Sequence, residues 1–206
     1  IDKNWETNRY RLGWELYSVG QRVPRQNQIF NLDPAYLTAL SQKTGETVNF
    51  GILKGIETII ISKIEGNNGG LYVGVQAGQH EAVHATALGK ILISEMDETE
   101  IRVLFANQPE FYRYTEHTIA NVEELIEEVR RVRAVGYAVD NQEFGVGLVC
   151  VARAVRDYTG KIVAAVSVST PANRMTEEHH AAIIDALGEC SSAISWTLGY
   201  RPQESV

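Results

Sequence analysis

The stretch from Gly136 to Pro171 reads GYAVDNQEFGVGLVCVARAVRDYTGKIVAAVSVSTP, and it decides the fold of the surrounding chain. It holds two apolar runs, and residues 157–160 (DYTG) between them have the composition of a four-residue hairpin loop built on a type I turn. Such a loop would place Arg156 opposite Lys161. We therefore predict an antiparallel hairpin with these facing pairs: Cys150 and Ser167, Leu148 and Ser169, and Ala152 and Ala165.

Side chains alternate along a strand, so this hairpin has two chemically different faces. The bulky face carries Val149, Val151, Val155, Ile162, Ala164, Val166 and Val168. The small face carries Leu148, Cys150, Ala152, Ala154, Ala165, Ser167 and Ser169. The bulky face predicts packing against a core helix. The small face, with its thiol and hydroxyls, is typical either of the floor of a ligand pocket or of a sheet that meets a close-packed helix. A one-residue change of register would move both serines to the opposite face.

The composition describes a globular protein. The chain has 206 residues, of which 44% are hydrophobic and 22% charged, which suits one domain with some extra elements. Its net charge of −7 argues against nucleic-acid binding by this chain itself. No apolar run is long enough to span a membrane, and the N-terminus has no apolar core of a signal peptide. Cys150 and Cys190 lie in apolar periodic segments, which predicts reduced thiols in a cytoplasmic protein.

The order of the remaining elements predicts an α+β fold with a central antiparallel sheet flanked by helices. A strand ends near Gly13. We expect further strands at 46–53, 56–64 and 70–77, and helices at 12–23, 34–44, 86–92, 98–106, 122–135 and 177–198. The predicted N-caps are Asp33, Thr86, Asn121 (with Glu124 completing a capping box) and Thr176. The charged residues of the helix at 122–135 are predicted to form a solvated face.

The helix that begins after Thr86 has a second possible role. The backbone amides of Ala87 and Leu88 have no partner inside a helix and would point out of its start, where a carboxylate or phosphate is favoured. Many helix starts bind only water, so this feature alone does not establish a site.

Three segments together resemble the IclR family of bacterial transcriptional regulators: HATALGK at 84–90, GYAVDNQEFGVGLVCVARAV at 136–155, and GKIVAAVSVSTPANRMT at 160–176. RYRLG and the following helix at 9–23 resemble the last wing strand and the linker helix of that family. The resemblance covers essentially the whole chain. Within it, the loop at 77–83 differs between members and carries His80 and Glu81 here.

The resemblance implies a GAF-like or profilin-like domain that binds a small effector, preceded by a linker helix. It implies residues 1–13 as the remnant of a wing strand, 14–30 as the linker region, 31–201 as the effector domain and 202–206 as a tail. Family members form dimers or tetramers and bind operator DNA through an N-terminal winged helix-turn-helix, which we expect to precede this chain. No membrane partner and no cofactor is expected. The implied effector contacts are the amides of Ala87 and Leu88 and the side chains of Asp140, Cys150, Ser167 and Ser169, with Val73 and Leu148 as apolar walls.

Three other functions compete with this one. Some GAF-type folds are cysteine-dependent methionine sulfoxide reductases, but a nucleophilic Cys150 would need a polarised environment and a resolving thiol, and Cys190 lies on a predicted buried stripe. A metal site is the second, although His80, His84, His117, His179 and His180 form no ligand motif. The third is an oligomerisation domain whose pocket is filled by its own side chains. We expect an effector domain, not an enzyme, that binds a carboxylate, keto acid or sugar acid.

Overall fold

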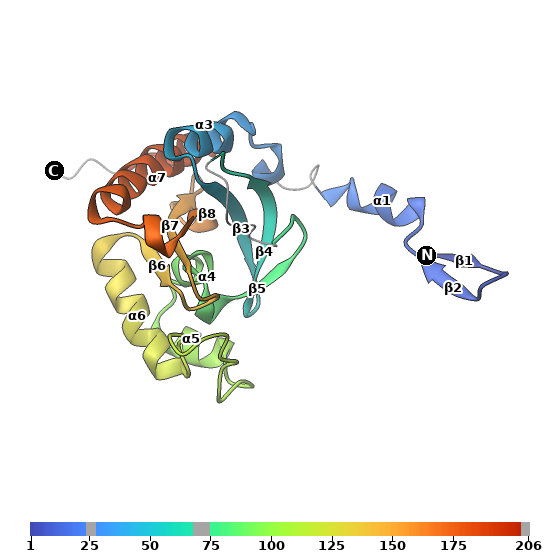
Figure 1. The fold of residues 1–206 in the computed structure, drawn as a ribbon, viewed down its shortest axis with the longest axis horizontal. Coiled ribbons are helices and arrows are strands. Elements are labelled where there is room, and N and C mark those ends of the chain that lie inside the picture. Colours follow the sequence, from blue (N-terminus) through green and yellow to red (C-terminus); the bar gives the residue numbers. More distant parts are fainter. Residues whose placement is uncertain (24–27, 68–74, 203–206) are drawn as a thin grey trace. The chain divides into compact units, whose positions relative to one another are not determined.

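A computed structural model describes residues 1–23, 28–67 and 75–202 (Figure 1). Internal contacts divide the chain into two units, Ile1–Asp33 and Pro34–Val206. The first unit holds a short antiparallel hairpin of β1 (Asp2–Asn4) and β2 (Arg9–Arg11), the helix α1 (Trp14–Gly20) and a 3-10 turn at Gln28–Asn31. The strand predicted to end near Gly13 is therefore β2, and the predicted helix at 12–23 is shorter than expected.

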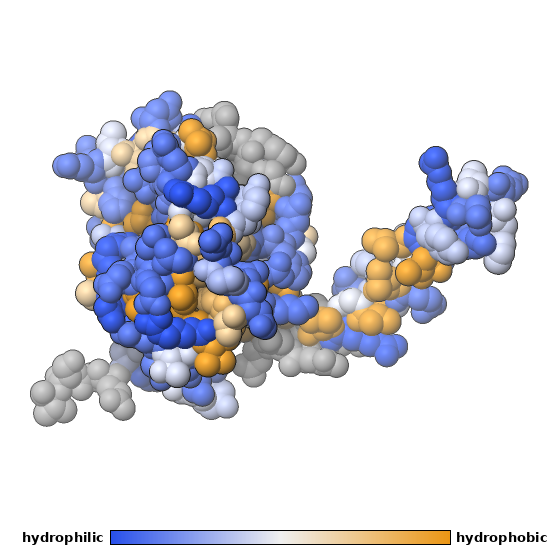
Figure 2. Space-filling model, turned by 90° about the horizontal axis from the view of Figure 1, so that it is seen from below, coloured by the Kyte–Doolittle hydropathy of each residue, from blue (hydrophilic) through white to orange (hydrophobic). Residues whose placement is uncertain are grey.

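None of the residues of α1 is buried, although its sequence is rich in apolar side chains. Figure 2 shows apolar surface along this helical part of the first unit. The exposed apolar residues of the segment are Leu12, Trp14, Leu16, Tyr17, Val19 and Val23. A helix of seven residues is too short to be stable in water without a packing partner.

The second unit is an α+β domain built on one six-stranded antiparallel sheet, as predicted (Figure 1). Its strands are β3 (Thr47–Lys54), β4 (Glu57–Ile64), β5 (His80–Ala82), β6 (Ala138–Asn141), β7 (Leu148–Arg156) and β8 (Ile162–Pro171). They lie in the order β5-β4-β3-β8-β7-β6. The first and the last of these strands in the sequence, β3 and β8, therefore pair at the centre of the sheet. The predicted strand at 70–77 falls largely on 68–74, outside the described residues, and β5 lies where a loop was expected.

Helices cover both faces of the sheet. On one face α7 (Glu177–Thr197) packs on β7 and β8, and α3 (Ala35–Thr44) packs on α7 and β3. On the other face α4 (Ala87–Leu92) packs on β7 and β8, with α6 (Val122–Val135) and α5 (Glu98–Leu104) outside it. Short 3-10 turns at Val83–Ala85 and Ala172–Arg174 precede α4 and α7.

The helix boundaries follow the predicted caps with one correction. The side chains of Thr86, Asn121 and Thr176 each accept a hydrogen bond from the amide three residues later, and Gly45 and Gly136 end their helices at positive φ. The prediction of Asp33 as the cap of α3 is wrong by one position, because Pro34 is the N-cap and the helix begins at Ala35. Glu124 also does not complete the predicted capping box, since its carboxylate accepts from the Ala120 amide and the Asn121 side-chain amide instead of the Asn121 backbone amide.

The β7–β8 register differs from the predicted one by two residues. A shorter loop and a bulge each contribute one residue, so the side chains between the bulge and the open end of the hairpin stay on their predicted faces. The Asp157 and Lys161 backbones pair directly, so the loop has three residues rather than four and Arg156 lies opposite Ile162. A bulge at Val163 then adds one more residue to β8, because Val155 lies opposite Ala164. The predicted pairs are therefore replaced by Cys150 with Ser169, Ala152 with Ser167, Ala154 with Ala165, and Leu148 with Pro171.

Because a two-residue shift preserves the alternation, the small face of the hairpin is as predicted. Leu148, Ala152 and Ala165 are buried against α4, with Cys150 and Ala154 beside them. Ile162 is the exception: it was predicted on the bulky face but packs with the small one, because the bulge at Val163 reverses the side chain beyond it. The small face thus meets the start of α4.

Candidate functional site

A hollow lies between the small face of the hairpin, the start of α4 and the β6–β7 loop. Its lining residues are Asn49, Glu81, Thr86, Ala87, Leu88, Asp140, Phe144, Leu148, Cys150, Ser167 and Ser169. Seven of the eight predicted site residues are in this list, and the eighth, Val73, lies outside the described residues. Glu81, Asn49, Thr86 and Phe144 are residues that the sequence reasoning did not place in the site.

The space left inside the hollow is small, about 20 Å³, which is enough for a single water. Most of the lining is deeply buried, but Glu81, Phe144 and Cys150 are only half-buried. A ligand larger than a water therefore requires side chains at this half-buried rim to move.

The floor of the hollow is a short chain of hydrogen bonds between three strands. The Cys150 thiol donates to Ser169 Oγ at 3.2 Å, and Asn49 Nδ2 donates to the same oxygen at 3.2 Å. β3 lies directly beside β8, which brings Asn49 to the two serines. Burial, and then the negative charge of Asp140, raises the pKa of the Cys150 thiol well above its usual value. Cys150 is thus a neutral thiol that donates a hydrogen bond.

Asp140 at the end of β6 points one carboxylate oxygen at backbone amides and leaves the other without a partner. Its Oδ1 accepts from the amides of Glu143 at 2.7 Å and Phe144 at 3.3 Å. Its Oδ2 is buried and accepts no hydrogen bond of standard geometry from the described residues, although the Cys150 thiol on the neighbouring strand interacts with the same carboxyl group. Burial raises the pKa of Asp140 to about 7, assisted by the charge of Glu143 and opposed by the two amides and Lys90. The carboxyl group is therefore partly protonated at neutral pH.

Two acceptors that the sequence reasoning missed face the same hollow. Glu81 lies in the edge strand β5 opposite Thr58, and burial followed by the charge of Asp140 raises its pKa to about 7. Asn49 Oδ1 is buried without a described partner. The alternation of β3 carried a signal for Asn49, because Thr47, Asn49 and Gly51 share one face while Val48 and Phe50 face the core helices. Nothing in the sequence assigned Glu81 to a strand.

The start of α4 borders the hollow from the other side. Thr86 Oγ1 accepts from the Gly89 amide at 3.2 Å and donates to the Ala82 carbonyl at 3.1 Å. The Lys90 amide donates to the Thr86 carbonyl at 3.1 Å and begins the helical hydrogen bonds, so the amides of Ala87 and Leu88 have no acceptor within the helix. A side chain at Gly89 would meet the Val83 backbone at 2.3 Å, so only glycine allows the helix this close to the preceding turn.

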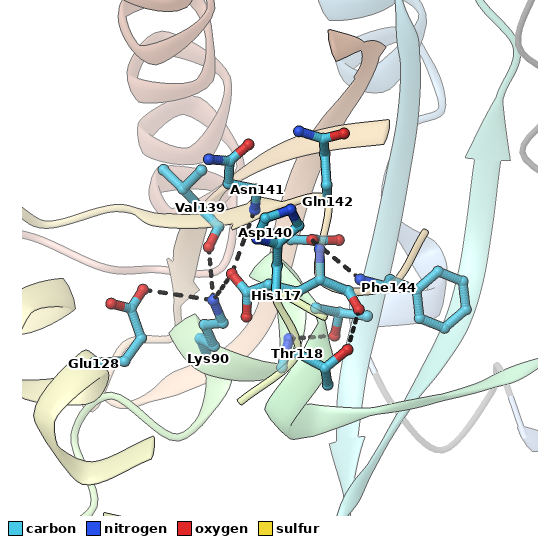
Figure 3. A network of polar contacts seen from close by, with 12 residues as sticks. Lys90, His117, Thr118, Glu128, Val139, Asp140, Asn141, Gln142 and Phe144 are labelled. Carbon is cyan, nitrogen blue, oxygen red and sulfur yellow. Dashed lines mark hydrogen bonds and ion pairs between the residues drawn. The ribbon is translucent and has the colours of Figure 1, made fainter. Parts of the chain in front are cut away.

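Behind the hollow, Lys90 forms a buried ionic cluster with Glu143 and Glu128 (Figure 3). Lys90 is 1% exposed, and its Nζ donates to Glu143 Oε1 at 2.6 Å and to the Val139 carbonyl at 2.7 Å, with Glu128 Oε1 at 3.5 Å. Glu128 thus departs from the predicted solvated face of α6. Burial raises the pKa of Glu128, but hydrogen bonds from Arg131 and the charge of Lys90 outweigh it, so the pKa is lowered overall.

The same cluster fixes the loop that carries Asp140. Thr118 Oγ1 donates to the Glu143 carbonyl at 2.6 Å, and Thr115 Oγ1 donates to the Gln142 carbonyl at 2.7 Å. Figure 3 shows Lys90, Thr118 and Asp140 gathered around this turn. The loop is held from one side by Lys90 and from the other by the two threonines.

The geometry does not favour the competing chemistries. Cys190 lies on α7, with its Sγ 3.7 Å from the Tyr36 carbonyl oxygen, and Cys150 faces α4 across the sheet, so the two thiols are on opposite faces. Within the described ranges no cluster of three or more His, Cys, Asp or Glu side chains could hold a metal. His179 is half-buried, with its Nε2 3.3 Å from Glu46 Oε1.

The fold and its relatives define the class of protein. The family described as bacterial transcriptional regulator IclR, C-terminal, matches residues 21–196. The chain therefore belongs to the IclR family of transcriptional regulators and contains its C-terminal effector-binding domain.

Individual relatives agree with this assignment. The chain is 36% identical over 200 residues to the HTH-type transcriptional regulator XynR of Escherichia coli K12, covering 97% of this chain and 79% of that protein. It is 31% identical to KdgR of Dickeya chrysanthemi, covering 98% of this chain and 65% of that protein, so it spans less than two thirds of this relative.

Solved structures give the same result. The structure of the Thermotoga maritima IclR superposes with a TM-score of 0.82 at 33% identity, over 96% of this chain and 79% of that one. The C-terminal domain of E. coli KdgR superposes with a TM-score of 0.73 at 31% identity, over 81% of this chain and 95% of that one. The curated relatives are named as regulators or repressors of transcription, which points to a regulatory role rather than a catalytic one. No described helix is long and apolar enough to cross a membrane.

Proposed function

We propose that the hollow between α4 and the β7–β8 hairpin binds a small carboxylate-bearing metabolite, such as a keto acid or a sugar acid. The observation that carries this proposal is the pair of buried acceptors, Asp140 Oδ2 and Asn49 Oδ1, that no described residue satisfies. A buried polar atom without a partner costs about 1–3 kcal/mol, and a ligand that supplies the missing hydrogen bond recovers that cost.

The expected binding mode divides the ligand between two ends of the hollow. The carboxylate or keto oxygen accepts hydrogen bonds from the amides of Ala87 and Leu88 and from the hydroxyls of Ser167 and Ser169. The other end of the ligand reaches Asp140, with Leu148 as an apolar wall. The raised pKa of Asp140 supports this arrangement, because a partly protonated carboxyl group repels an anionic ligand less than an ionised one.

In the full-length regulator, binding at this site would change how a winged helix-turn-helix holds operator DNA, with the protein acting in the cytoplasm as a homodimer or tetramer. The exposed apolar residues of α1 support a packing partner for this segment. Mobility of an operator fragment bound by the full-length protein, with and without the acid, tests the coupling. Light scattering after size exclusion tests the oligomeric state.

The test of the site is a thermal-shift screen with keto acids, sugar acids and aromatic acids, repeated on variants. A ligand at a hundred times its Kd stabilises the folded state by about 2.7 kcal/mol. Replacing Ser167 and Ser169 together by alanine, or making Asp140→Asn, should abolish the shift without unfolding the domain. Ser191→Ala is the matched control, because this serine is equally buried but lies on α7, beyond the opposite face of the sheet. If the best acid stabilises all four proteins equally, the proposed site is wrong.

A further inference from the structure

The hollow is unusually rich in hydrogen-bond acceptors. Asp140 Oδ2 and Asn49 Oδ1 are buried and have no hydrogen-bond partner among the described residues, and the carboxyl group of Glu81 faces the same space from β5. No lysine, arginine or histidine is among its described lining residues. The nearest cation is Lys90, which is held behind the hollow by Glu143 and the Val139 carbonyl. The donors of the hollow, the serine hydroxyls and the amides at the start of α4, are assigned to the ligand carboxylate, so the acceptors Asp140, Asn49 and Glu81 are complementary to a ligand whose other end brings donors.

We propose that Glu81 is a specificity-determining residue of this site, and that Glu81, Asp140 and Asn49 together select an acid whose end remote from the carboxylate carries hydroxyl groups. This inference rests on the proposed function, since it concerns the ligand of the same hollow.

The selection follows from the cost of unpaired polar atoms. A carboxylate accepts hydrogen bonds and donates none, a protonated carboxyl group keeps an acceptor oxygen beside its one donor, and the oxygen of a side-chain amide only accepts. A polyhydroxy acid supplies one donor to each of these oxygens. An acid with an alkyl end displaces any water from the hollow and leaves the same oxygens buried and unsatisfied. A site built around polar groups rejects the ligand that lacks the matching group far more strongly than an apolar pocket rejects an extra methylene.

Charge explains how such a site still admits an anion. The titratable groups that face one another here are Glu81, Asp140 and Cys150, with Tyr114 near Glu81. Glu143 and Lys90 act on Asp140 from behind with opposite signs. Because the pKa values of Glu81 and Asp140 both lie at about 7, the pair retains part of its protons at neutral pH. The negative charge that meets an incoming carboxylate is thereby reduced.

Glu57, on the neighbouring strand β4, provides a matched control for Glu81. Side chains alternate on β5, so Glu81 faces the hollow while His80 is exposed on the other side, where its ring pairs with Glu57 at 2.7 Å. Glu57 lies opposite Ala82 in the β4–β5 pair and does not line the hollow. Glu57→Met and Glu81→Met therefore remove the same group from the same edge of the sheet, but only the second change affects the site.

The experiment measures affinity by calorimetry for four-carbon acids of equal length: butyrate, 3-hydroxybutyrate and 2,3,4-trihydroxybutyrate, at constant ionic strength and pH 7. We expect the trihydroxy acid to bind the wild-type protein about tenfold more tightly than butyrate, the equivalent of one satisfied acceptor. Glu81→Met should reduce this ratio to about threefold or less, and Glu57→Met should leave it unchanged. Glu81→Gln keeps the shape of the side chain and one acceptor, so its affinity ratio should lie between those of the wild-type protein and Glu81→Met. It replaces Glu81→Met in the test if the methionine variant unfolds.

The possible results separate this inference from the proposed function. Equal affinity for butyrate and the trihydroxy acid overturns the selection of hydroxyl groups but leaves an acid-binding site standing. A preference for hydroxyl groups that survives in both Glu81 variants overturns the role of Glu81. Tighter binding of 4-aminobutyrate than of the trihydroxy acid replaces hydroxyls by an ammonium group as the selected feature. If no acid in the wider screen binds the wild-type protein, both proposals are wrong.

Discussion

Two buried polar groups lie on opposite sides of the same short turn after β6, and they differ in whether their charges are compensated. Behind the turn, Lys90 has carboxylate and carbonyl partners within hydrogen-bonding distance. In front of it, Asp140 Oδ2 and Asn49 Oδ1 have no described partner. Glu143 belongs to the first group and Asp140 to the second, although they are three residues apart and joined by a hydrogen bond of 2.7 Å.

The difference separates a structural cluster from the proposed binding site. A buried ion pair positions the backbone that carries it, and its loss is costly because the remaining charge stays buried. Here Lys90 pairs with Glu143 Oε1, although Glu143 Oε2, like Asp140 Oδ2, accepts from no described residue. A buried carboxyl group without a counterion destabilises the fold, and such groups concentrate at functional sites. The first group therefore holds the turn, and the second faces the hollow that we propose as the ligand site. Changes in the two groups should affect stability with opposite signs.

The largest effect is expected from Lys90→Met. It leaves Glu143 buried without its cation, while Glu128 keeps Arg131, so the free energy of unfolding should fall by about 3–5 kcal/mol. Urea denaturation at pH 7 measures the change. Lys43→Met is the control, since its partner Glu189 is exposed and no measurable loss is expected. Adding Glu143→Leu to Lys90→Met should recover part of the loss. A loss below about 1 kcal/mol, the range of surface pairs, would contradict the structural role of Lys90.

Asp140→Asn should act in the opposite direction and depend on pH. The folded-state pKa of about 7 lies above the ordinary value of 3.8, so the stability associated with this group is complete below pH 4 and is lost as the pH rises to 7. Its contribution to the slope is about 1.4 kcal/mol per pH unit at most. The variant should therefore be less sensitive to pH between 5 and 7 and more stable than the wild-type protein at pH 8.

Urea denaturation at pH 5, 6, 7 and 8 measures this slope. His84 changes stability in the opposite sense, because burial lowers its pKa, but it is present in both proteins and cancels from the difference. The exposed Asp185 on α7 supplies the control variant Asp185→Asn, which should reproduce the wild-type slope. A parallel pH profile for Asp140→Asn would show that Asp140 is ionised normally in the folded state.

A smaller effect is expected at Cys150. Burial and the nearby Asp140 raise the pKa of its thiol, and burial alone raises that of Cys190 to about 11, so both should react slowly with iodoacetamide at pH 8. Asp140→Asn should accelerate Cys150 while leaving Cys190 unchanged, which peptide mass spectrometry resolves. A wild-type Cys150 that reacts as fast as a free thiol would contradict its neutral state. It would also favour the alternative function, a cysteine-dependent methionine sulfoxide reductase.

The smallest effect is expected at the surface of α6. Arg130 is half-exposed and pairs with Glu98 and Glu127, whose exposed charges are screened by solvent. Arg130→Gln should leave the melting temperature within experimental error. A clear loss of stability would mean that the exposed ion pairs of Arg130 stabilise the fold as much as the buried Lys90 pair does. That result would contradict the distinction between buried and surface ion pairs.

Much of the site could be predicted because alternation is robust. The small face of the hairpin placed Cys150, Ser167 and Ser169 together, even though the loop is one residue shorter than predicted and β8 contains a bulge. Two offsets of one residue preserve parity, and parity alone decides which face a side chain joins. A single offset would have put both serines on the opposite face.

Residues contributed by distant strands could not be predicted in the same way. Asn49 reaches the floor only because β3 pairs with β8, more than a hundred residues away, and Glu81 because an expected loop forms the edge strand β5. The Lys90 cluster was also missed. Helical periodicity assigns Glu128 to a solvated face of α6, but it carries no information about α4, which packs beside α6.

The sequence by itself determined the α+β class, the capped helices and the face on which the thiol and hydroxyls lie, since these depend on local periodicity and turn chemistry. Only the tertiary structure decided which carboxyl groups are paired and which are left facing the hollow. Whether a buried charge is compensated depends on atoms that long-range packing brings within a few ångströms, and no local pattern encodes that distance.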